Sequence, residues 1–202
     1  MFRLYQMNSS GNCYKIRLLL TQLQIPFEII EIDILKQESR TPEFLVKNPN
    51  GRVPVLETPD GKFLAESNAI MFYLSQDSEF FPADKWQQAK VMEWLFFEQY
   101  SHEPYIATSR YWITLLGKAD EYREALHQKK EPGYAALRVM EKHLEKNRFF
   151  VGDRYTIADI GLFAYTHVAP EGGFDLTPFL AIQAWIQRIM GQPRYFNMKD
   201  QC

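Results

Sequence analysis

Short apolar runs near the start of the chain predict strands. Residues 2–5 and 27–33 have strand length and composition, and the apolar stripe from Ile16 to Leu23 between them has helical spacing. A strand, a helix and a second strand in this order form a βαβ unit with parallel strands and a right-handed crossover. Pro26 ends the predicted helix. This part of the chain therefore predicts a small sheet with a covering helix.

The stretch from residue 48 to residue 74 predicts a hairpin followed by a helix; its sequence is NPNGRVPVLETPDGKFLAESNAIMFYL. Residues 53–57 and 62–65 have strand composition, and Pro59-Asp60-Gly61 between them favours a tight turn. Pro54 lacks the N–H that a sheet ladder uses, so it belongs at a strand start or edge. A helix opening at Glu66-Ser67 would cover the completed mixed sheet.

After residue 84 the pattern is helical. A long, aromatic-rich helix is expected to begin with Met92, Leu95, Phe96 and Gln99 and to kink at Pro104, and residues 117–120 are expected to break it. Gly133 is expected to interrupt a weaker helical stretch, and the helix after it should end near Asn147.

Two further helices are predicted towards the C-terminal end. Thr156 and Asp159 form the acidic variant of a capping box before an apolar run. A last helix starts at Pro178, with a predicted inner face of Leu180, Ala184, Trp185 and Ile189.

Composition and charge narrow the function classes. The 202 residues are 46% hydrophobic with a formal net charge of −2, and residues 1–78 hold 8 Lys+Arg against 9 Asp+Glu, so no basic face indicates nucleic-acid binding. The sequence shows neither a signal-peptide pattern nor an apolar run long enough to cross a membrane. Cys13 and Cys202 form no CxxC pair, which suits a reducing compartment. We therefore expect a cytoplasmic protein that binds neither nucleic acid nor membrane.

The hairpin and the helix after it carry a candidate peptide site. Ser67 offers a hydroxyl and a backbone N–H at a helix N-terminus, where unpaired donors and the helix dipole stabilise a carboxylate. The Glu66 carboxylate can hold an ammonium group. If the Val53–Pro54 bond is cis, the backbone of Val53 turns outward and can pair with an extended peptide.

The run NPNGRVPVLE followed by ESNAI resembles the glutathione-binding half of the cytosolic glutathione S-transferases, and Thr-Ile-Ala-Asp at 156–159 resembles the start of their buried helix. The resemblance implies an α/β thioredoxin-like domain of order βαβ-ββα at residues 1–76, a linker at 77–84 and an all-α domain at 85–202. It also implies a homodimer that conjugates glutathione to a small hydrophobic electrophile, a detoxification reaction.

Resemblance to the Ser-type classes (theta, delta and zeta), and to their bacterial members, implies a thiol-activating Ser six positions before the first apolar residue of the first helix. Counting back from Ile16 reaches Ser10. A free thiol, with a pKa of about 8.5, is mostly protonated at neutral pH, and a donor at a helix N-terminus stabilises the thiolate. Two neighbours stay open as alternatives: Asn12 can donate through its amide, and Cys13 can form a mixed disulfide with glutathione. Tyr5 is a weaker candidate, because strand burial explains it more simply.

The remaining site residues are expected around the peptide and along the long helix. Arg40 or Arg52 can pair with the glycyl carboxylate of glutathione. The wall for the electrophile is expected at His102, Tyr105, Arg110 and Tyr111. No ligand spacing indicates a metal. Two rival functions remain open: a glutathione-dependent thiol–disulfide oxidoreductase or peroxidase that uses Cys13, and a non-catalytic glutathione-binding regulatory protein.

Overall fold

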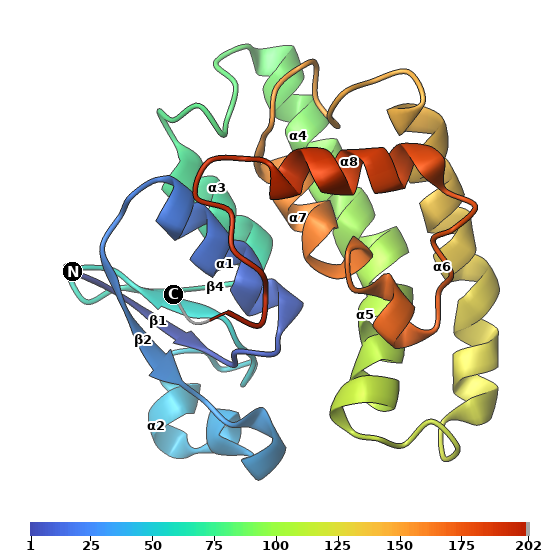
Figure 1. Cartoon of the computed structure of the whole chain (residues 1–202). Coiled ribbons are helices and arrows are strands. Elements are labelled where there is room, and N and C mark those ends of the chain that lie inside the picture. Colours follow the sequence, from blue (N-terminus) through green and yellow to red (C-terminus); the bar gives the residue numbers. More distant parts are fainter. Residues whose placement is uncertain (201–202) are drawn as a thin grey trace. The chain divides into compact units, whose positions relative to one another are not determined.

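The computed structural model describes residues 1–200, which form two compact units (Figure 1). The first unit comprises Met1–Ser78 together with residues 193–200, and the second comprises Glu79–Gln192. This grouping differs from the predicted division at both ends. Residues 79–84 belong with the helices, where the Phe80 carbonyl accepts a hydrogen bond from the Ile157 N–H at 3.0 Å. Residues 193–200 belong with the sheet, where they bind side chains of the first helix.

The first unit is built on a four-stranded mixed sheet with strand order β2-β1-β3-β4. β1 (Phe2–Gln6) pairs in parallel with β2 (Phe27–Glu31) and antiparallel with β3 (Val55–Glu57), which pairs antiparallel with β4 (Phe63–Ala65). The predicted βαβ unit and hairpin are confirmed, and with them the thioredoxin-like order of elements.

Two helices of the first unit pack against each other, α1 (Gly11–Gln22) and α3 (Ser67–Ser75) (Figure 1). The predicted apolar stripe of α1 is buried except at Leu23, which is the half-buried C-cap. The short α2 (Pro42–Leu45) starts after Thr41, whose hydroxyl oxygen accepts from the Phe44 N–H. Two 3₁₀ turns precede α2: η1 (Ile34–Lys36) and η2 (Glu38–Arg40).

The described part of the second unit is helical. Its elements are α4 (Lys85–Phe97), the π-helical η3 (Glu98–His102), α5 (Glu103–Arg110), the π-helical η4 (Tyr111–Leu115), α6 (Arg123–Leu144), α7 (Ile157–Thr166), the 3₁₀ turn η5 (Ala169–Gly172) and α8 (Leu180–Met190). The predicted long helix begins earlier than Met92, at Lys85. The expected irregularity near Pro104 is present as η3, which ends at His102, two residues before the proline; proline cannot continue a regular N–H ladder.

Helix α7 is the centre of the second unit, because all ten of its residues are buried. A helix that is apolar all round has no face to offer to water. The predicted capping box is confirmed: the Thr156 side chain accepts from the first turn, and the Asp159 carboxylate accepts from the Thr156 N–H at 2.9 Å. Asp159 also accepts from the Trp185 indole N–H at 3.0 Å, which ties α8 to the start of α7.

Two expectations for this unit are wrong. Gly133 does not interrupt a helix, since α6 runs through Pro132 and Gly133. A Cβ at Gly133 would lie 2.4 Å from the ring of Phe174, so the glycine makes room for a buried aromatic side chain. In α8 the buried residues are Ile182, Trp185 and Ile189, whereas Leu180 is 72% exposed and Ala184 is also exposed. The helix begins at Leu180 rather than Pro178, and Leu180 and Ala184, four positions apart, lie on its outer side.

None of the helices in residues 1–200 is long and apolar enough to cross a membrane.

Candidate functional site

Ser10 is the N-cap of α1. Its backbone is extended (φ −79°, ψ 125°), and its hydroxyl oxygen accepts a hydrogen bond from the Cys13 N–H at 3.4 Å. The Ser10 N–H donates to the Met7 carbonyl at 3.0 Å, which closes a turn just before the helix. The side chain is half-buried. Ser10 thus lies at the positive end of the α1 dipole, where an anion is stabilised.

The N-terminal turns of α1 and α3 are linked by a chain of hydrogen bonds. The Ser67 hydroxyl donates to the Asn12 side-chain oxygen at 3.3 Å, and the Lys15 ammonium donates to the Ser67 hydroxyl oxygen at 3.4 Å. Lys15 is fully buried and Ser67 nearly so. The structure therefore brings two predicted site residues, Asn12 and Ser67, into contact. Lys15 was missed from the sequence, where its only signal is a charged residue directly before the apolar stripe.

Glu66 occupies a strained backbone conformation at the N-cap of α3, with φ +68° and ψ 113°. A non-glycine residue rarely adopts this region, and such strain clusters at ligand sites. The Glu66 side chain is exposed and makes no capping hydrogen bond to the helix. The strain turns the chain from β4 into α3 at the point where Ser67 meets Asn12.

The Val53–Pro54 peptide bond is cis. Pro54 is buried directly before β3, and Val53 is half-buried. Among the described residues, the backbone N–H and C=O of Val53 have no hydrogen-bond partner. Val53 therefore retains a donor and an acceptor for an extended peptide.

Asn48 organises the loop before Val53. Its side-chain amide donates to the Arg52 carbonyl at 2.8 Å, and its side-chain oxygen accepts from the Asn50 N–H at 3.0 Å. Arg40 donates to the Asn50 carbonyl at 2.9 Å and packs where a side chain on Gly51 would lie. Arg40 thus supports this loop, while the Arg52 side chain is exposed. Asn48 was not predicted as a site residue; its position in the NPNG turn was the available signal.

Cys13 is fully buried in the first turn of α1. Burial raises the pKa of its thiol to about 11, because desolvation disfavours the thiolate; hydrogen bonds from Ser10 and from the Met7 N–H oppose this shift only in part. A thiol that is buried and protonated is a poor nucleophile.

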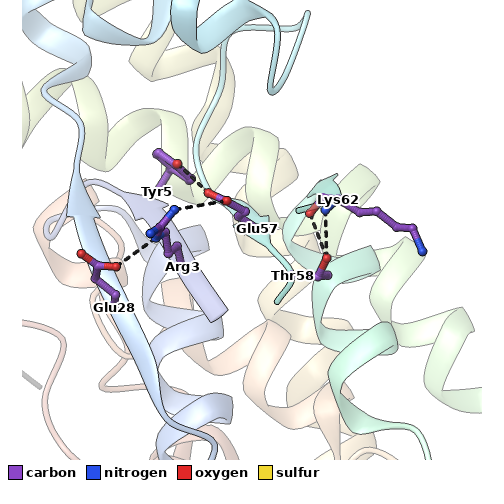
Figure 2. Close-up of polar contacts among 6 residues, drawn as sticks. All are labelled: Arg3, Tyr5, Glu28, Glu57, Thr58 and Lys62. Atoms are coloured by element: carbon purple, nitrogen blue, oxygen red, sulfur yellow. Dashed lines mark hydrogen bonds and ion pairs between the residues drawn. The ribbon is translucent and has the colours of Figure 1, made fainter. Parts of the chain in front are cut away.

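Tyr5 belongs to a polar network on the sheet (Figure 2). Its hydroxyl donates to the Glu57 carboxylate at 2.7 Å, and Arg3 pairs with Glu57 and with Glu28. Burial, and then the hydrogen bond to Glu57, raise the pKa of Tyr5 to about 12. The Tyr5 hydroxyl therefore uses its hydrogen in the bond to Glu57 on the sheet.

The residues expected to contact an electrophile lie in the second unit. His102 is fully buried, with its Nε2 2.9 Å from the Thr166 hydroxyl, and Arg110 forms a 2.7 Å ion pair with Glu171. Tyr105 and Tyr111 are half-buried. The Lys129 ammonium lies 5.6 Å from the centre of the Tyr105 ring. His102 and Arg110 are thus engaged inside the helical unit, and the two tyrosines are more accessible.

In residues 1–200 no three His, Cys, Asp or Glu side chains gather as metal ligands.

Comparison with known proteins identifies the family. Residues 1–76 match the family model for the glutathione S-transferase N-terminal domain, and residues 95–193 match that for the glutathione S-transferase C-terminal domain. The chain belongs to the glutathione S-transferase family. Among solved structures of this family, a glutathione S-transferase from Pseudomonas fluorescens Pf-5 is 49% identical, with a TM-score of 0.97 over 98% of this chain and 99% of that one. A glutathione S-transferase from Xanthobacter autotrophicus Py2 is 41% identical, with a TM-score of 0.95 over 98% and 97%.

One curated relative is named for an oxidoreductase activity and not for a transferase activity. The disulfide-bond oxidoreductase YfcG of Escherichia coli is 26% identical to this glutathione S-transferase family member, over 90% of this chain and 87% of the relative. Family membership therefore leaves the reaction to be argued from the site.

Proposed function

We propose that this protein binds glutathione in its first unit and transfers it, as the thiolate, to a hydrophobic electrophile. The observation that carries the proposal is the junction of the α1 and α3 N-termini, where Asn12, Lys15 and Ser67 are joined by hydrogen bonds. Helix N-termini and an ammonium group favour a carboxylate, so the γ-glutamyl carboxylate of glutathione fits this junction. The exposed Glu66 carboxylate is the partner for the γ-glutamyl ammonium.

The rest of the peptide fits the other predicted contacts. The backbone N–H and C=O of Val53, held before Pro54, would pair with the cysteinyl residue as a short antiparallel bridge. The exposed Arg52 is the better candidate for the glycyl carboxylate, because Arg40 already binds the Asn50 carbonyl. Ordering a flexible tripeptide along a preformed surface lowers the entropic cost of the later reaction.

Ser10 is our candidate for the thiol activator, which matches the Ser-type classes. A serine hydroxyl has one donor and two acceptor sites, so while its oxygen accepts from the Cys13 N–H, its hydrogen can turn from the Cys13 sulfur to the sulfur of glutathione. Such a bond and the α1 dipole stabilise the glutathione thiolate. The thiolate then attacks the electrophilic carbon, forming the S–C bond while the leaving group departs with its electron pair.

Thiolate absorbance in the ultraviolet, recorded for bound glutathione from pH 5 to pH 9, tests both binding and activation. We expect a saturable thiolate signal with an apparent pKa well below that of the free thiol, loss of most of that signal in Ser10→Ala, and its retention in Ser10→Thr. If Asn12→Ala abolishes the signal while Ser10→Ala retains it, Asn12 is the activator. Calorimetric binding without any thiolate would identify a non-catalytic glutathione-binding protein, and no binding would overturn the proposal.

A second candidate is a glutathione-dependent disulfide oxidoreductase, which the name of the YfcG relative favours. The burial and raised pKa of Cys13 argue against a route through that thiol. Disulfide reductase activity that is lost in Cys13→Ser and unchanged in Ser10→Ala would support the cysteine route over the transferase.

We further propose a cytoplasmic homodimer. Each unit exposes aromatic side chains of the kind that interfaces bury, Phe72 and Tyr73 on α3 and Trp86, Phe96 and Tyr100 on the α4–η3 helix. Light scattering coupled to size exclusion should give twice the chain mass, and Phe96→Glu should lower it; a wild-type monomer would contradict the proposal.

A further inference from the structure

The C-terminal end of the described chain is fastened along α1, and we name residues 193–200 the C-terminal strap (Figure 1). The Tyr14 hydroxyl donates to the Phe196 carbonyl at 2.7 Å, and the two rings meet edge to face with 5.6 Å between their centres. Near the start of the strap, the Gln22 amide donates to the Pro193 carbonyl at 3.3 Å. The strap therefore follows α1 back towards its N-terminus.

Arg17 joins the strap to the loop before α1. Its guanidinium donates to the Met198 carbonyl at 3.0 Å and to the Asn8 carbonyl at 2.9 Å, and it also donates to the Asn8 side-chain oxygen. The planar fork of Arg suits this task, because it presents several donors in a fixed geometry. Arg17 is fully buried, so these contacts are shielded from water.

Asn8 lies inside the turn that presents Ser10. The turn is closed by the Ser10 N–H on the Met7 carbonyl, and its other side is tied to β2 by the Asn8 N–H, which donates to the Glu31 carboxylate at 2.7 Å. The position of Ser10 therefore depends on Arg17 on one side and on Glu31 on the other.

We propose that Arg17 and the C-terminal strap position the Ser10 loop and thereby set the acidity of the bound glutathione thiol. This inference rests on the proposed function of Ser10. Arg17 is a positioning residue: it holds the backbone carbonyl and the side-chain amide oxygen of Asn8 in the loop, and the Met198 carbonyl in the strap. A donor stabilises a thiolate only while it points at the sulfur, so a loop that fluctuates loses part of that stabilisation.

The thiolate titration of bound glutathione is compared in wild type, Arg17→Met, Arg17→Lys and Asn8→Ala. We expect Arg17→Met to raise the apparent pKa by about one unit, as loss of one hydrogen bond to a charged group implies, and Asn8→Ala to raise it less. Lys keeps the charge of Arg17 without its fork, so Arg17→Lys should behave like Arg17→Met. Arg3→Met is the matched control, because Arg3 pairs with Glu28 and Glu57 on the sheet. In this variant the apparent pKa of the bound glutathione thiol should equal the value in wild type.

A chain ending at Gln192 tests the strap itself. We expect it to show the same raised pKa as Arg17→Met, with kcat reduced and KM for glutathione little changed. Amide hydrogen exchange of residues 8–13, measured without glutathione, should be faster in both variants.

Each other outcome contradicts part of the proposal. A wild-type pKa in Arg17→Met, or in Asn8→Ala if Arg17→Met does not fold, overturns the role of Arg17. Full rescue by Arg17→Lys would assign the effect to charge rather than positioning. A wild-type pKa in the shortened chain overturns the role of the strap. If wild type binds no glutathione, the proposed function fails, while the exchange rates still report whether Arg17 holds the loop.

Discussion

Ser10 and Cys13 share the first turn of α1 but have different surroundings. Ser10 is half-buried and caps the helix, whereas the Cys13 sulfur is sealed in the core beside the Met7 N–H. Burial lowers the reactivity of the thiol by disfavouring its charged form. In the sequence both residues are candidates for the thiol chemistry. In the structure they differ in their access to solvent, because Ser10 is half-buried and Cys13 is fully buried.

Cys13 should react slowly with thiol reagents in the folded protein. In a Cys202→Ser variant, Cys13 is the remaining thiol, and a pKa of about 11 leaves only about one molecule in a thousand to one in ten thousand ionised at pH 7–8. We expect alkylation at least about a hundredfold slower than for free cysteine, and fast alkylation in denaturant. Rapid labelling of the folded variant would contradict this assignment and revive the cysteine route.

At the scale of elements, α6 and the segment after η5 depend on each other through Gly133 and Phe174. Gly133 costs the helix intrinsic stability, since glycine is about 1 kcal/mol less favourable than alanine in a helix interior. The space left by its missing side chain is filled by the Phe174 ring, which also meets Tyr134 edge to face at 5.3 Å.

Gly133→Ala should therefore destabilise the protein despite the better helix former. Overpacking of this kind costs about 1–3 kcal/mol, which outweighs the gain in propensity. Urea unfolding should show a net loss of about 1–2 kcal/mol. In a Phe174→Ala background the same change should become neutral or stabilising, and a stabilising effect in wild type would show that the Phe174 ring relaxes without cost.

For the whole molecule, two buried groups of the second unit give the stability opposite pH dependences. Burial raises the pKa of Asp159 to about 6, so its contribution to stability is present below about pH 4 and is lost as the pH rises through 6. Burial lowers the pKa of His167 to about 4, so its contribution is present above about pH 6.5 and is lost as the pH falls through 4. His167 stacks on Phe163, with 4.3 Å between ring centres, and donates to the Phe163 carbonyl.

When one of the two groups is removed, the free energy of unfolding should show the pH dependence that the other group causes. In His167→Phe, which keeps a ring stacked on Phe163, the free energy of unfolding should fall between pH 4 and pH 6 by about 2–3 kcal/mol relative to the wild-type profile. In Asp159→Asn it should instead rise with pH over the same window. Chemical denaturation in steps of half a pH unit measures both; parallel profiles for all three proteins would contradict the assigned pKa values.

Local chemistry in the sequence was sufficient for most elements of the first unit. The hairpin at residues 53–65, the capped α7 and the apolar stripe of α1 are specified by residues close together in the chain, which is why their patterns predict them. The family could be inferred in the same way, from short motifs with characteristic spacing; the roles of Val53, Glu66 and Ser67 stay predictions.

Contacts between distant residues required the tertiary structure. The continuity of α6 depends on Phe174, about forty positions after Gly133, and helix propensity contains no information about that ring. The burial of Cys13 and the contact of Lys15 with Ser67 follow from the packing of α1 in the first unit. The fastening of residues 193–200 to Arg17 likewise joins segments from opposite ends of the chain. The sequence by itself determined the family and most of the elements, because these follow from motifs and patterns of neighbouring residues. Tertiary structure decided which side chains are accessible and which contacts hold the Ser10 loop, because desolvation and long-range hydrogen bonds arise only when the chain is folded.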